Sequence, residues 1–478
     1  MSQVSQGAEQ EKSTARLAPE GGSRAYGAVL VLACLGQFMV VLDVSIVNIA
    51  LPAIKADLGF DDTGLQWVVN AYSLTFAGLL LLGGRIADLA GRKRVFVAGV
   101  TLFTVSSLLG GLADTPGLLI AARVVQGLGA AVLAPATLTI LTTTFTEGPR
   151  RTRAIASWTA VGAVGGAVGG ILGGVLTEYL SWRWILLINV PVGVAIVAAA
   201  VPLLAESRVR LGGGGLDVLG TILVTSGISL VAFGTVQSET YGWAAWQTLA
   251  PLATGTVALG AFLLWERRLT GRGRTPLVPL HLLRSRQVAG GTLVMLITGA
   301  AYIAMWYFMS LHMQVDLGYT PVQTGLAFIP HTLTMMASSR LSARLMPRFG
   351  RRTLVAAGSL IGAAGFAWQA VMAGDYVTGV LLPGLVMCFG GSLAFTPAAL
   401  AGTSGAGPGE AGLLSGLLNT SRQVGGSLGL AALATVAAAV HGAPAAGYSR
   451  AFIVGTALLL LSAIVAMAIL PRERAATR

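Results

Sequence analysis

The stretch that decides the fold is Leu35–Pro52, LGQFMVVLDVSIVNIALP, in which one carboxylate, Asp43, interrupts an apolar run. The wider run from Ala25 to Leu51 exceeds the about 20 apolar residues that a helix needs to cross a bilayer. An ionised side chain at that depth costs roughly 2.5–3.5 kcal/mol on insertion scales, so it is kept where it is paired or used. We therefore expect Asp43 to take up and release a proton.

The composition of the 478 residues excludes a soluble domain. Only 10% of the residues are charged and 54% are hydrophobic, with a mean hydropathy of +0.76, whereas soluble proteins carry about 25% charged residues. The 64 glycines agree with this, because small residues let helices approach closely in lipid. The sequence therefore predicts an all-α polytopic membrane protein.

Hydropathy predicts fourteen spans joined by short loops. Their approximate bounds are 26–51, 67–84, 95–112, 117–141, 154–177, 184–204, 216–236, 247–265, 288–311, 322–343, 353–373, 377–402, 411–440 and 450–470. Segments on the N-terminal side of the membrane hold 26 of the 31 lysines and arginines, and those on the other side hold 3. Because basic loops stay in the cytoplasm, we expect both termini to be cytoplasmic.

The remaining composition indicates the kind of cell and membrane, and which ligands we do not expect. Many arginines, few lysines and abundant alanine and glycine indicate a GC-rich bacterial genome, and hence the bacterial cell (inner) membrane. The net charge of +12 follows the loop pattern and does not indicate nucleic-acid binding. Cys34 and Cys388 both lie in apolar spans, so we expect no disulfide, no metal site and no cofactor. Residues 1–24 are polar and lack a signal-peptide core, which predicts a disordered cytoplasmic tail, and 471–478 form a second tail.

An internal repeat divides the chain into halves. GRIADLAGRKRVFVAG at 84–99 resembles ARLMPRFGRRTLVAAG at 343–358, at an offset of 259. The GGxxG of residues 165–169 recurs at 425–429, at an offset of 260. Two matches at nearly one offset imply a duplicated unit of about six spans, and parallel halves around a central site are a transporter design.

The repeat sets the predicted domains. An N-terminal six-helix bundle occupies 25–205, two inserted spans and a cytoplasmic loop occupy 206–287, and a C-terminal six-helix bundle occupies 288–470. The glycine-rich tract at 205–215 predicts a flexible link after the first bundle.

The loop Gly84–Arg94, GRIADLAGRKR, predicts a tight cytoplasmic turn at Gly91, since glycine accepts backbone conformations that other residues resist. Asp88 lies among basic residues and would form charge-assisted bonds that latch one bundle to the other. A solvated loop that only sets topology is the alternative. The loop resembles the signature of the major facilitator superfamily, G-x-x-x-D-x-x-G-R-[KR]-[KR], with the latch residues Gly84, Asp88, Gly91 and Arg92 in place.

Arg123 is a second charge within a span, in the stretch ARVVQGLGAAVLAPATL that begins at Ala122. By rise per residue, Asp43 and Arg123 both lie in the outer half of the membrane and are able to meet. Movement that changes their separation would then change proton occupancy, whereas a snorkelling Arg123 is the alternative. The stretch is similar to the superfamily segment R-x-x-Q-G-x-G, which the family associates with proton coupling; Arg123, Gln126, Gly127 and Gly129 fill it.

The fifth span is rich in glycine, which close helix packing alone would explain. It resembles the exporter motif G-x-x-x-G-P-x-x-G-G, which is thought to separate antiporters from importers. The matching residues are Gly162, Gly166, Gly169 and Gly170, and Ala167 replaces the proline.

Three further stretches resemble one branch of the superfamily, the fourteen-span drug:proton antiporters of bacteria. They are LDVSIVNIALP at 42–52, SWRWILLINVPVG at 181–193 and LLNTSRQVGGSLG at 417–429. The resemblance implies two six-helix bundles that rock about a central cavity, with proton entry driving export of hydrophobic drugs or antibiotics, cations among them. Two alternatives are a dedicated exporter of one natural product made by the same cell and, remotely, a polytopic membrane enzyme.

The expected partners are a small-molecule substrate, protons and lipid, with a monomeric protein and no nucleic acid. Methionine and aromatic residues of the ninth span suit apolar ligands, although a packing or lipid-facing stripe explains each of them as well. The candidate cavity residues are Asn48, Gln126, Trp158, Tyr302, Trp306, Met309, Gln314 and Arg422. For Arg422 we favour a partner across the bundle interface over an anionic group of the substrate. His312 and His331 are weak candidates, and we expect neither to pair with a carboxylate.

Overall fold

The computed structural model describes residues 23–145, 149–206, 217–272, 276–278, 282–371, 375–404, 411–439 and 444–472. Every regular element within these ranges is a helix. Nearly all of the predicted N-terminal tail, most of the link at 205–215 and most of the C-terminal tail lie outside the described residues.

The described residues of the first half form eight helices. Their bounds are α2 Ser23–Leu58, α3 Asp62–Leu65, α4 Trp67–Ala90, α5 Arg92–Gly111, α6 Pro116–Thr144, α7 Pro149–Tyr179, α8 Trp184–Leu187 and α9 Asn189–Leu203. Local sequence fixes where such helices begin: Thr115 caps α6 through a bond from the Leu118 amide, and Pro116 follows at the first helical position.

The inserted pair and the second half follow. Their bounds are α10 Val218–Tyr241, α11 Trp246–Gly271, η1 Leu282–Arg284, α12 Arg286–Leu311, η2 His312–Asp316, α13 Pro321–Ala327, α14 Ile329–Val371, η3 Val377–Leu381, α15 Leu382–Gly402, α16 Ala411–Ala438 and α17 Pro444–Ile469. Thr320 begins α13 with a complete capping box, and η2 is a π-helical turn at the end of α12.

Eleven of the described helical segments are long and apolar enough to cross a membrane. One of them, Pro321–Val371, contains two predicted spans, because α14 turns back at Gly350. Each of the fourteen predicted spans falls on a described helix, and the predicted all-helical fold is confirmed.

The internal repeat is visible in the backbone. Gly91, between α4 and α5, has a φ of +105°, and Gly350, its repeat partner within α14, has a φ of +74°. An L-residue is strained at either angle, so glycine at both turns has one physical cause. The two halves therefore reverse direction by the same device.

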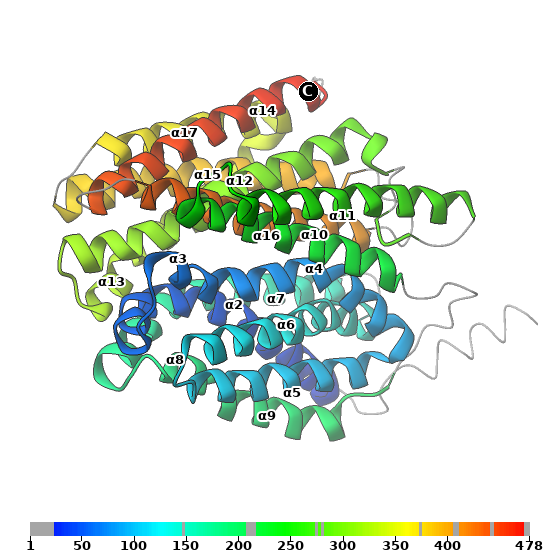
Figure 1. The fold of residues 1–478 in the computed structure, drawn as a ribbon. Helices are drawn as coiled ribbons and strands as arrows, with labels where there is room; N and C mark the ends of the chain where they lie inside the picture. Colours follow the sequence, from blue (N-terminus) through cyan, green and yellow to red (C-terminus); the bar gives the residue numbers. More distant parts are fainter. Residues whose placement is uncertain are drawn as a thin grey trace, which may run out of the picture.

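Figure 1 shows the helices in two groups, with α2 to α9 in one and α12 to α17 in the other. Helices α10 and α11 pack on each other, and α10 also contacts α4 and α16, so the inserted pair touches both groups. We call the end of the molecule that holds the Gly91 and Gly350 turns the terminal end, since α2 begins and α17 ends there. The opposite end, where α7 ends and α13 begins, is the distal end.

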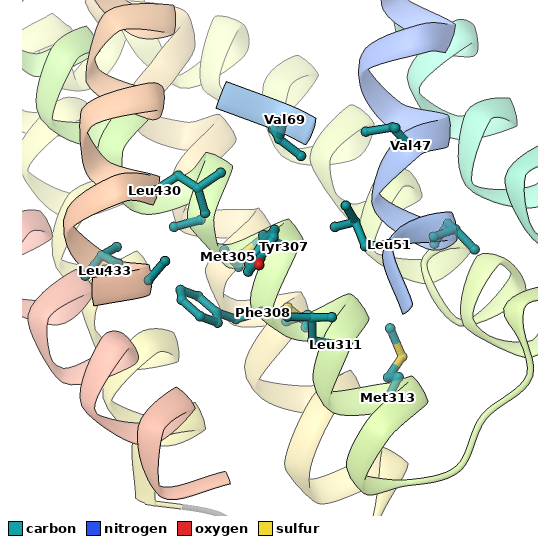
Figure 2. Close-up of a cluster of buried hydrophobic side chains, with 14 of the residues drawn as sticks. Val47, Leu51, Val69, Met305, Tyr307, Phe308, Leu311, Met313, Leu430 and Leu433 are labelled. Carbon is teal, nitrogen blue, oxygen red and sulfur yellow. The ribbon is translucent and has the colours of Figure 1, made fainter. Parts of the chain in front are cut away.

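The two groups are joined chiefly toward the distal end. There α7 packs against α13, α2 against α12 and α13, and α3 against α16, while α4 and α16 pack together. Figure 2 shows part of the largest buried apolar cluster, in which Val47, Leu51 and Val69 of the first group lie near Tyr307 and Leu430 of the second. A continuous apolar core thus crosses the boundary between the halves.

Candidate functional site

The centre of the site is a buried ion pair between α2 and α6. Arg123 donates from a terminal guanidinium nitrogen to Asp43 Oδ2 over 2.6 Å, and the two side chains are 1% and 0% exposed. Breaking such a pair by removing one partner costs about 3–5 kcal/mol, because a bare charge is left in the interior. The structure therefore brings together the two charges that the sequence singled out; their role in proton coupling stays a prediction.

Glycines of the same motif let the neighbouring helices approach α6. A Cβ on Gly127 would meet the Tyr72 backbone on α4, and a Cβ on Gly129 would lie 2.7 Å from the Phe103 amide nitrogen on α5. Neither site has room for a larger residue. The R-x-x-Q-G-x-G pattern thus combines the polar groups of the site with the small residues that enclose them.

Three further side chains complete the Asp43 network. Gln126 Nε2 donates to Asp43 Oδ1 and to Ser107 Oγ, each over 2.7 Å, while its Oε1 accepts from Arg123. Asn189 Nδ2 donates to Asp43 Oδ1 over 3.2 Å. Gln126 is therefore a buried partner of the ion pair, and its place in the substrate cavity stays a prediction. Ser107 and Asn189 were not among the predicted site residues, although Asn189 lies in the quoted stretch 181–193.

Arg123 also contacts α4, the helix that packs on both α6 and α16. Its Nε donates to the Val68 carbonyl of α4 over 3.0 Å, and its guanidinium carbon lies 4.4 Å from the centroid of the Tyr72 ring. Since α4 also packs on α16 of the second group, Arg123 contacts a helix that lies at the interface between the halves.

The predicted latch is only partly described. Gly91 makes the expected turn and Arg92 is buried, but the side chain of Asp88 lies outside the described residues. The amides of Lys93 and Arg94, at the start of α5, both bond Glu206, each over 3.3 Å, which places a carboxylate at a helix N-terminus. The acidic latch stays a prediction.

The glycine motif of α7 serves two packing surfaces. Gly162, Gly166 and Gly169 face α2, where Ser45 Oγ donates to the Gly166 carbonyl over 2.7 Å. Gly170 faces α13 of the second group, close to Gly325. This arrangement explains the small residues by packing alone, and their role in antiport stays a prediction.

Two predicted cavity residues lie where α2 and α12 meet. Ser310 donates to the Asn48 carbonyl over 2.8 Å, and Gln314 Nε2 donates to the Ile49 carbonyl over 3.0 Å. Trp158, on α7, is half-buried and donates to Thr137 Oγ1 over 3.0 Å.

The aromatic stripe of α12 is mostly internal packing. Tyr302 is buried and donates to the Met387 carbonyl over 2.8 Å, and Met309 is fully buried. Trp306 is half-buried with its ring 4.8 Å from that of Phe328. In this arrangement the second group of helices encloses both side chains, and the placement of Tyr302 and Met309 on a cavity wall stays a prediction.

Arg422 and His312 also differ from expectation, whereas His331 does not. Arg422 is half-buried on α16 and donates to Asn419 one turn earlier over 3.2 Å; among the described residues it makes no ion pair across the interface. His312 does pair with a carboxylate, Asp316, whose oxygen lies 2.6 Å from its Nδ1. The i, i+4 spacing was present in the sequence and would have found this pair. His331 is buried and bonds backbone carbonyls.

Comparison with known proteins decides the family. The model of the Major Facilitator Superfamily matches residues 33–430. The chain belongs to this superfamily. It is a transporter, and among its described residues no cluster of metal ligands occurs.

Relatives within this superfamily are exporters and resistance proteins by name. The chain is 48% identical over 450 residues to the cephamycin export protein CmcT of Amycolatopsis lactamdurans, covering 92% of each chain. It is 39% identical to the puromycin resistance protein pur8 of Streptomyces alboniger, over 93% of this chain and 90% of that one. It is 32% identical to the multidrug resistance protein Stp of Mycobacterium tuberculosis, over 86% and 75%.

Solved structures confirm the superfamily fold. A bacterial homologue of the human lysosomal transporter Spinster superposes with a TM-score of 0.64 at 15% sequence identity, covering 94% of this chain and 97% of that one.

Proposed function

We propose that this superfamily member exports one antibiotic, made by the same cell, in exchange for protons. The observation that carries the proposal is the 48% identity to a cephamycin export protein along 92% of both chains. The similarity to pur8, named for resistance to one other antibiotic, supports the same kind of substrate. Broad multidrug efflux is the second candidate, favoured by the weaker similarity to Stp.

The buried ion pair supports proton coupling. In the bonds described for Asp43, its two carboxylate oxygens only accept, from Arg123, Gln126 and Asn189. Three donors around one carboxyl group suit its ionised form. A proton on Asp43 would displace the Arg123 contact, and the guanidinium would need another anion or water. Proton binding would therefore accompany a movement of α6 relative to α2, which is the coupling that an antiporter requires.

The contacts between the halves support alternating access. They are concentrated toward the distal end, and the positive-inside pattern makes the terminal end cytoplasmic. We therefore assign this arrangement to the inward-facing state, in which substrate enters from the cytoplasm. Separation of α7 from α13 would open the distal end and release the substrate outside.

Arg422 supports an anionic group on the substrate. The guanidinium lies half-buried within the membrane span α16, with an amide oxygen as its described side-chain partner. A cation within a membrane span is costly when no carboxylate pairs with it, so a ligand that supplies one gains affinity. This is the second of the two roles that the sequence left open for Arg422, in place of the favoured partner across the bundle interface.

Transport into proteoliposomes tests the proton coupling. We expect an imposed pH gradient to drive transport by the wild type and not by Asp43→Asn, because an amide does not exchange a proton at neutral pH. Substrate-for-substrate exchange without a gradient should persist in this variant. Asp43→Glu, which keeps a titratable group, is the matched control. Gradient-driven transport by Asp43→Asn at the wild-type rate would contradict the assignment.

A susceptibility test separates the two substrate classes. A sensitive host that expresses the chain is challenged with a cephamycin, puromycin, a cationic dye and an antiseptic. Protection against one chemotype supports dedicated export, whereas protection against several unrelated compounds supports multidrug efflux. Asp43→Asn provides the inactive control in the same host.

A further inference from the structure

We propose that His312 and Asp316 form a second proton-binding site, which controls closure of the distal end. The site belongs to the second half of the molecule and is separate from the Asp43 network on α2 and α6. It goes beyond the proposed export function, because it concerns the stability of one conformation and holds whatever the substrate is.

The pair has the geometry of a proton-binding site. The His312 Nδ1 and Asp316 Oδ2 atoms are 2.6 Å apart, and the two side chains are 10% and 18% exposed. The other ring nitrogen, Nε2, is buried and has no hydrogen-bond partner among the described residues. Histidine is the side chain whose ordinary charge change falls between pH 5 and 8. The exposed edge of Asp316 gives protons from the distal side a route to the ring.

The titratable groups on the helices around His312 keep one charge state between pH 5 and 8. On α12 the neighbouring titratable residue is Tyr307, and on α17 they are Tyr448, whose ring centroid lies 6.3 Å from that of His312, and the exposed Arg450. Tyrosine stays neutral and arginine stays charged over this pH range. The helix α13, which also contacts the turn, has no titratable side chain.

The same turn carries contacts that hold the two halves together. Ser310 and Gln314, on either side of His312, bond the backbone of α2 at Asn48 and Ile49. Directly after Asp316, Gly318 turns the chain with a φ of +66° into α13. A π-helical turn is a departure from the ordinary helix that occurs often at functional sites. A change in the His312–Asp316 pair therefore acts on the segment that positions these contacts.

Helix α13 completes the closure. The Val322 amide donates to Glu178 of α7 over 3.0 Å, and the backbones of Gly325 and Gly170 lie side by side. A protonated His312 faces Asp316 as a full ion pair, whereas the neutral ring only donates to the carboxylate, so protonation strengthens the contact. Protonation from the distal side should therefore hold the turn in place and stabilise the closed distal end.

Distances between two spin labels test the proposal directly. The labels are attached at Leu180→Cys, just beyond α7, and Leu326→Cys on α13, which are 59% and 48% exposed. They are measured in lipid nanodiscs, without substrate or gradient, from pH 5.5 to 8. We expect the short-distance population of the wild type to fall as the pH rises, and that of His312→Gln to stay constant.

Three further variants make the outcome decisive. Asp316→Asn removes the carboxylate that faces the ring, so the pH response of the distal end should be weaker than in the wild type. Any pH response that remains in Asp43→Asn should be lost in the Asp43→Asn/His312→Gln double variant, which separates this site from the Asp43 network. A wild type without pH response, or a His312→Gln variant that responds like the wild type, would overturn the proposal. Neither outcome depends on whether the chain exports an antibiotic.

Discussion

At the scale of residues, Arg123 connects two helices at once. Its Nε binds the Val68 carbonyl on α4 while a terminal nitrogen binds Asp43 on α2. We expect Arg123→Ala to abolish gradient-driven transport. The substrate dissociation constant should change by less than about threefold, which is well under the tenfold change that 1.4 kcal/mol represents. Parallel measurements of transport in proteoliposomes and of ligand binding in detergent check this.

Arg123→Lys is the matched control for that experiment. A lysine keeps the charge, but its single ammonium does not reproduce the planar fork that reaches Val68, Asp43 and Gln126 together. Its coupling should therefore be intermediate. A loss of affinity in Arg123→Ala without a loss of coupling would show that Arg123 contacts the substrate instead.

Arg422 is the residue at which substrate charge is tested. If it binds an anionic group, Arg422→Gln should weaken substrate binding roughly 10- to 100-fold, since a hydrogen bond to a charged group contributes about 1.5–3 kcal/mol. Arg422→Lys should retain most of the affinity. Equilibrium binding to the purified protein measures both variants. Equal affinities for the wild type and Arg422→Gln would show that this guanidinium has a structural role.

The sequence identified the ion pair because a charge in a membrane span is rare and expensive, and rise per residue placed Asp43 and Arg123 at one depth. It did not identify Ser107 or Asn189 as partners of the pair. Polar residues without charge are common in spans, and one sequence does not tell which face of each helix points at the others. Asp316 was missed although its i, i+4 spacing from His312 was sufficient to find it.

At the scale of elements, the crossing of α7 and α13 gives an asymmetric test. A Cβ on Gly325 would overlap the Gly170 carbonyl oxygen, whereas a Cβ on Gly170 would lie at an ordinary 3.7 Å from the Gly325 carbonyl oxygen. We expect Gly325→Ala to disfavour the closed distal end and Gly170→Ala to leave it intact. Alkylation of a cysteine at Leu326 by an impermeant reagent, in each background, reports opening. Equal reactivity in the two variants would contradict this packing.

The elements themselves were predictable, and their crossings were not. The repeat in the sequence predicted two equivalent turns, and Gly91 and Gly350 both have positive φ angles. The contact of Gly170 with Gly325 joins residues from different halves that have no sequence relation to each other. Such a contact depends on how far the halves have rotated, which hydropathy and spacing do not specify.

At the scale of the whole molecule, fourteen spans and two related halves followed from hydropathy and repetition, but the conformational state did not. Alternating access requires that one sequence support at least two packings of the same halves, so the sequence is compatible with each of them. Contacts at the distal end, such as those of Ser310 and Gln314 with α2, are specific to one packing. They support the proposed inward-facing state over an outward-facing one.

That assignment predicts that a covalent bond across the distal end stops the cycle. The Val322 amide of α13 donates to the Glu178 carboxylate of α7 over 3.0 Å, so cysteines at both positions are placed to test whether oxidation joins the two helices. We expect the oxidised double variant to lose transport, to regain it on reduction, and to bind substrate as before from the cytoplasmic side. The native Cys34 and Cys388 are buried, and each single-cysteine variant controls for them. Transport by a fully cross-linked protein would show that α7 and α13 stay together throughout turnover, and the distal end would then not be the exit.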